Sequence, residues 1–99
     1  MLDRLTAASF APHVGEVFLL RVDATTTLEA RLAAAEEVPW ASGGPGKRVP
    51  FSVLFLGPRW PVLPQRIYRL EHHALGALEL FLVPIRRDES GVTYEAVFN

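Results

Sequence analysis

Apolar and polar residues alternate along much of the chain, and this period of two predicts a protein built mainly from β-strands. The alternation is clearest near the C-terminus, where the residues of one face are Val92, Tyr94, Ala96 and Phe98. Further strands, rich in β-branched and aromatic residues, are expected at 16–22, 49–57, 66–73 and 77–85.

The segment 27–37 (TLEARLAAAEE) carries two conflicting signals. Its Ala, Leu, Glu and Arg content favours a helix, and Thr26 and Glu29 have the spacing of a helix capping box. Its alternation favours a strand, with one face formed by Leu28, Ala30, Leu32 and Ala34. We favour the strand, because a strand returning from the short turn after residue 22 would form a hairpin with 16–22.

One short helix is predicted before the first strand, over 5–15. Thr6 can cap its first turn, Pro12 and Gly15 end it, and Phe10 is a natural packing residue. Six closely spaced strands with one short helix predict a mainly β protein, all-β or α+β, with a single domain spanning 1–99. The expected architecture is a small antiparallel β-roll or barrel.

Two connections are rich in proline, and the first of them is also rich in glycine. The segment 39–48 (PWASGGPGKR) is predicted to be a loop, and it lacks the phosphate-binding pattern because Ala41 and Arg48 stand where Gly and Ser or Thr are required. The three prolines of 58–65 exclude a helix or a central strand. We expect Trp60 and Val62 of this connection to fold back over an exposed sheet face.

The hydrophobic pattern also predicts a register for the hairpin formed by 66–73 and 77–85. A three-residue loop at 74–76, with Gly76 left-handed, would place Leu70 opposite Leu80 and Glu71 opposite Glu79. Tyr68, Leu70, Leu78, Leu80 and Leu82 would then share the core face. In this register His72 and His73 point to opposite faces, so the two histidines could not bind one metal ion together.

Few residues of the chain suggest a catalytic or metal-binding site. Glu71, His73 and Glu79 could form a divalent-metal site, but three ligands on a flat outer face lack a pocket, so a solvated charged patch is favoured. His72 is interpreted as a partly buried, hydrogen-bonded histidine, and no serine lies in a nucleophile motif. We therefore predict no catalytic, cofactor-binding or metal-binding residue and no cofactor.

The composition and charge of the chain limit the classes of partner that it is expected to bind. The chain has 99 residues, no cysteine and a net charge of −1 with acids and bases interspersed, which argues against a nucleic-acid or membrane partner. The first residues do not form a signal peptide and no apolar run could span a membrane, so a soluble cytoplasmic protein is expected.

The blocks LTAASFAPHVGEVF, PFSVLFLGP, LPQRIYRLEHHALGALELFLVPI and GVTYEAVFN resemble a small bacterial family known as a domain of unknown function. The resemblance implies a short stand-alone protein, favours a strand at 27–37, and associates some members with phage-tail-like genes. It implies no functional residue.

The leading hypothesis is a non-catalytic protein–protein interaction or assembly module, binding a protein partner or a second copy through apolar side chains and a free strand edge. Its contact candidates are Phe51, Trp60, Phe81 and Trp40, because aromatic residues dominate interface energetics. The alternatives are a small-ligand-binding β-barrel and a metal-dependent enzyme that uses Glu71, His73 and Glu79.

Overall fold

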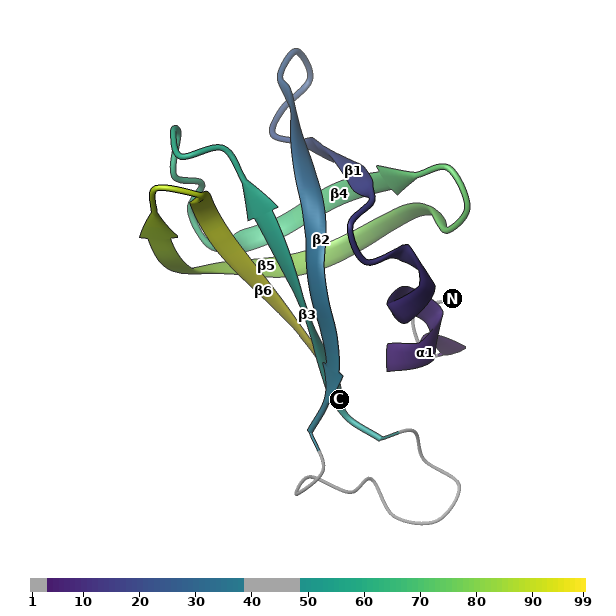
Figure 1. Cartoon of the computed structure of the whole chain (residues 1–99). Coiled ribbons are helices and arrows are strands. Elements are labelled where there is room, and N and C mark those ends of the chain that lie inside the picture. The colour runs from purple at the N-terminus through teal and green to yellow at the C-terminus, as the bar shows by residue number, and fades with distance from the viewer. Residues whose placement is uncertain (1–3, 39–48) are drawn as a thin grey trace.

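Six antiparallel strands form a closed barrel in the computed structural model, which describes residues 4–38 and 49–99 (Figure 1). The strands are β1 (Val17–Arg21), β2 (Thr27–Glu37), β3 (Phe51–Gly57), β4 (Arg66–His72), β5 (Gly76–Asp88) and β6 (Gly91–Phe98). Around the barrel they follow the order β1-β2-β3-β6-β5-β4, and β4 pairs with β1. The predicted mainly β fold, and the strand at 27–37, are confirmed.

The two longest strands, β2 and β5, bend, and each pairs with one neighbouring strand along its first part and with another along its second part. The first part of β2 pairs with β1 and its second part with β3, while β5 pairs first with β4 and then with β6. The register shifts between Leu32 and Ala34 and between Pro84 and Arg86, near these changes of partner. An extra residue bends a strand and increases its twist, so these bulges help the sheet to close.

The N-terminal helix closes one end of the barrel. It consists of α1 (Ala7–Phe10) and a 3-10 turn, η2 (Ala11–His13), and Ser9 Oγ accepts the Thr6 backbone N–H at 3.0 Å. Phe10 is fully buried, with its ring centroid 6.0 Å from Phe51 and 5.6 Å from Phe98. The predicted packing role of Phe10 is therefore confirmed. Among the described helices, none is long and apolar enough to cross a membrane.

Side chains of the inner strand faces fill the barrel. The face predicted to be apolar in the last strand is buried, and its residues are Val92, Tyr94, Ala96 and Phe98. The β3–β4 connection is fixed to this core by Leu63, which is buried and whose N–H donates to Tyr94 Oη at 2.9 Å. The prediction that Trp60 and Val62 cover a sheet face is wrong, because the exposed fractions of these residues are 76% and 40%.

The predicted register of the β4–β5 hairpin is wrong by two residues. Leu70 lies opposite Leu78 and Glu71 opposite Ala77, so Glu71 does not oppose Glu79. The turn occupies 73–75, and Gly76 follows it with the predicted positive φ, here 77°. The core face is nevertheless as predicted, because a shift of two residues keeps every side chain on its own face.

Two expectations about the surface are also wrong. Phe51 is not on an outer face: it is fully buried and its ring stacks on Phe98 at a centroid distance of 4.5 Å. The strands close into a barrel, so the described chain has no terminal strand of an open sheet of the kind expected to bind a partner. Trp40 and the predicted loop 39–48 lie outside the described residues.

Candidate functional site

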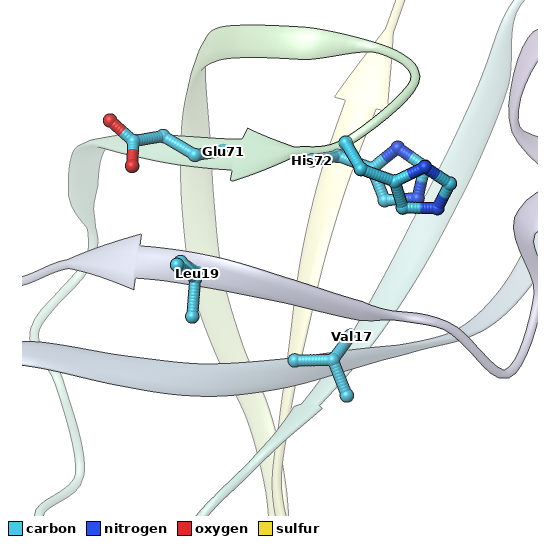
Figure 2. A pocket seen from close by; sticks show the side chains of 5 residues that line it. Val17, Leu19, Glu71 and His72 are labelled. Carbon is cyan, nitrogen blue, oxygen red and sulfur yellow. The ribbon is translucent and has the colours of Figure 1, made fainter.

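An open groove of about 440 Å³ lies where β1 begins and β4 ends (Figure 2). Its lining residues are Val17, Leu19, Glu71, His72 and His73. The antiparallel register of these two strands, with Leu19 opposite Glu71, brings the residues before β1 close to those after β4. The groove is therefore lined by β1 on one side and by the end of β4 and the turn residue His73 on the other, and Glu16 directly precedes the lining residue Val17.

Glu16 is held at this border by its backbone. Gly15 N–H donates to Leu32 O at 2.7 Å, and Leu32 N–H donates to Glu16 O at 3.0 Å. Glu16 N–H in turn donates to His13 O at 3.0 Å. Gly15 has a φ of 94°, a conformation that glycine adopts without steric cost, and it allows the chain to turn from η2 into β1.

All three histidines of the chain contact one oxygen of the Glu16 side chain. The distances to Glu16 Oε1 are 2.7 Å from His72 Nε2, 2.9 Å from His13 Nδ1 and 3.2 Å from His73 Nε2. These four residues, His13, Glu16, His72 and His73, are called the Glu16 cluster below. The prediction that His72 and His73 are kept apart is thus wrong, because His73 lies in the turn, beyond the last residue of β4.

Hydrogen bonds define the protonation of His72. Its Nδ1 accepts the backbone N–H groups of Ala74 and Leu75, each at 3.1 Å, so this nitrogen carries no proton. Nε2 therefore carries the proton and donates it to Glu16. The His72 side chain has no exposed surface and its ring stacks on Phe18 at a centroid distance of 4.3 Å. The predicted hydrogen-bonded histidine is confirmed, and its side chain is buried completely rather than partly.

The electrostatics of the cluster favour an ionised Glu16. Hydrogen bonds from His72 and then from His13 lower the pKa of this carboxyl to about 2, against a smaller opposing effect of desolvation. The side chain remains 39% exposed, so the carboxylate is reachable from solvent. Glu16 is thus an accessible anion that carries up to three imidazole donors at neutral pH.

Glu71 lines the same groove but belongs to a different network. Its Oε2 accepts hydrogen bonds from Arg21 Nε at 3.1 Å and Arg69 Nε at 3.0 Å, and these bonds lower the pKa of the carboxyl. Figure 2 shows its carboxylate pointing away from the His72 ring. Glu79 lies opposite Arg69 on β5. The proposed ligand set of Glu71, His73 and Glu79 is therefore not brought together.

The side chains that could bind a metal ion lie close together at Glu16, and not at Glu71 and Glu79. In the described ranges, the one group of three or more such side chains whose ligand atoms all lie within 4.8 Å of one another is His13, Glu16 and His72. Sequence reasoning missed the roles of His13 and Glu16, which lie 59 and 56 residues before His72. The signal available in the sequence was that Glu16 and the histidines border two predicted strands, and only the pairing of those strands makes them neighbours.

The interface candidates are scattered over the barrel. Phe81 is 51% exposed on the outer face of β5 and Trp60 is exposed in the β3–β4 connection, whereas Phe51 is internal. Phe81 lies directly opposite Ile67 of β4, which is 64% exposed. Whether any of these residues contacts a partner stays a prediction.

No curated protein matches the chain. No solved structure matches it either. Residues 5–98 match the family described as Domain of unknown function (DUF6916). This match covers nearly the whole chain, and the resemblance inferred from the sequence blocks is confirmed at the level of a family of unknown function. The chain belongs to this family.

Proposed function

We propose that the protein is a non-catalytic docking module that binds a protein partner through the outer face of β1, β4 and β5. The observation that carries this proposal is the pair formed by Ile67 and Phe81, two large apolar side chains that lie opposite each other and are 64% and 51% exposed. Isolated exposed apolar residues are common, but adjacent ones on a rigid sheet form an anchor of the kind found at interfaces.

The same outer face carries a second apolar pair and a charged row between the two. Val17 and Leu19 are exposed at the other end of the face, beside the groove. Between the pairs, Glu71 forms ion pairs with Arg21 and Arg69. Apolar anchors supply affinity, while an ordered charged row favours one orientation of a partner over others. This arrangement supports docking of a macromolecule on the face.

A ligand inside the barrel is less well supported. The interior is occupied by the chain's own side chains, and the largest of those with no or almost no exposure include Tyr94, Phe18, Phe55, Leu20 and Leu70. Small barrels of this kind are usually filled in this way. A binding role for the protein is therefore assigned to its outer surface.

The class of partner follows from the resemblance. Because the resemblance associates some family members with phage-tail-like genes, we propose a component of a tail-like or other surface assembly as the partner. Self-association through the same face is the competing outcome, and the two are separated by the solution mass of the purified protein.

Phe81→Glu tests the proposal, because it places a charge at the centre of the apolar pair without touching the core. Val97→Glu is the matched control, because Val97 is 57% exposed on the outer face of β6, which is not one of the three strands of the proposed docking face. Tagged protein should capture a defined partner from the producing cell, identified by mass spectrometry. Alternatively, it should show a concentration-dependent mass in light scattering.

Phe81→Glu should abolish this capture or association and Val97→Glu should preserve it, with both variants folded by circular dichroism. A strictly monomeric protein that captures no partner, or a partner lost equally in both variants, would count against the proposed face.

A further inference from the structure

We propose that the Glu16 cluster binds a divalent transition-metal ion of the Zn²⁺ class. The ligands would be His13 Nδ1, His73 Nε2 and a carboxylate oxygen of Glu16. This site is independent of the proposed docking function, and it differs from the set Glu71, His73 and Glu79 that the sequence suggested.

Two of the three pairs of ligand atoms are already close to the required spacing. His13 Nδ1 and His73 Nε2 lie 2.9 and 3.2 Å from Glu16 Oε1. Two ligands bound tetrahedrally to Zn²⁺ at 2.0–2.2 Å are separated by about 3.3 Å. Shifts of a few tenths of an ångström therefore suffice for these nitrogen–oxygen spacings. The third pair, His13 and His73, is not close to it, because His73 lies outside the group whose ligand atoms are all within 4.8 Å of one another. The His73 side chain, which is 73% exposed in a turn, must therefore move toward His13 when the ion binds.

His72 is assigned a positioning role rather than a ligand role. A metal bound at Nε2 would require the proton to move to Nδ1, but Nδ1 already faces the backbone N–H groups of Ala74 and Leu75. That change would set three donors against one another in a buried site. His72 instead keeps its Nε2 proton and donates it to Glu16, as groups around metal ligands commonly do.

The ligand types select the ion. Two imidazoles and one carboxylate suit Zn²⁺ and similar transition metals, whereas Mg²⁺ prefers oxygen ligands and water. Because the Glu16 side chain is 39% exposed beside an open groove, water would complete the coordination sphere. When the ion binds, each of the two imidazoles changes tautomer through solvent: the proton leaves His13 Nδ1 or His73 Nε2 and the other nitrogen of the same ring takes one up. Each ring therefore stays neutral.

Calorimetric titration of tag-free, metal-stripped protein with Zn²⁺ tests the site, with Mg²⁺ as the second probe. We expect saturable 1:1 binding of Zn²⁺ and none of Mg²⁺. The variants His13→Gln, Glu16→Gln and His73→Gln should each weaken Zn²⁺ binding at least about tenfold. Glu71→Gln is the matched control, because Glu71 lines the same groove but is held by arginines, and it should leave the affinity within about twofold.

No saturable Zn²⁺ binding would overturn the proposal, and so would a loss in Glu71→Gln as large as in Glu16→Gln. Long-range ¹H–¹⁵N NMR of the imidazoles tests the roles within the site. Zn²⁺ should move the signals of His13 Nδ1 and His73 Nε2 to metal-bound positions and leave His72 protonated at Nε2. A metal-bound His72 Nε2 would overturn the assignment of His72 as a positioning residue. Circular dichroism of each variant confirms that a lost affinity does not come from unfolding.

Discussion

Replacing His72 with phenylalanine should destabilise the protein although the new side chain keeps the shape of the site. The His72 side chain has no exposed surface and stacks on Phe18 at 4.3 Å, and phenylalanine can preserve that stacking. What the substitution removes is the pair of ring nitrogens. The turn after β4 then loses its internal acceptor and Glu16 loses its shortest hydrogen bond.

The magnitude follows from the two hydrogen bonds at Nδ1. Each backbone N–H donor of Ala74 and Leu75 loses a bond that contributes about 1 kcal/mol net, so the free energy of unfolding should fall by about 2 kcal/mol. The bond to Glu16 is not added, because that carboxylate is exposed and water can replace the donor. A domain of this length has a stability of about 5–15 kcal/mol, so the loss is a substantial fraction of the total.

Urea unfolding at pH 7, followed by far-ultraviolet circular dichroism, measures this change. The urea midpoint should fall with an unchanged slope, and the melting temperature should drop by about 8–16 °C. A His72→Phe variant within about 0.5 kcal/mol of the wild type, the range of neutral surface changes, would refute the reasoning. It would mean that the Nδ1 hydrogen bonds do not anchor the turn.

Phe10→Ala should lower the free energy of unfolding, measured by urea titration, by about 3–5 kcal/mol, because Phe10 is fully buried between Phe51 and Phe98. An unchanged urea midpoint would show that α1 does not close the barrel. Glu16→Gln should lower the free energy of unfolding at pH 5–7. The difference in this free energy between the variant and the wild type should shrink as pH falls from about 4.5 towards 2, because the pKa of Glu16 in the folded protein is lowered to about 2. A difference that grows over that acidic range would contradict the second prediction.

The hydrophobic pattern predicts which face a residue occupies better than it predicts which residue lies opposite. Leu70 and Leu80 are both buried on the predicted core face, yet Leu70, which the pattern places opposite Leu80, lies opposite Leu78. An even shift leaves the alternation unchanged, so only the turn distinguishes the two registers. The turn begins at His73, which the sequence pattern had included in the strand.

The Glu16 cluster could not be assembled from the sequence for a related reason. Local patterns identify β1 and β4 as strands but do not say that they are neighbours, because that pairing is made when the barrel closes. Glu16 and His72 are 56 residues apart. The chemistry of His72 was nevertheless predictable, since an alternating strand placed it on the core face, where a histidine requires hydrogen-bond partners.

The most direct test of the Glu16 cluster is a pH titration of the Glu16 side-chain carboxyl, followed by its ¹³C chemical shift in metal-free protein. Three imidazole nitrogens within 3.2 Å of one carboxylate oxygen should give a pKa of about 2. A pKa at or above the ordinary value of 4.5 would show that the histidines do not gather on Glu16, and would contradict the account of this site.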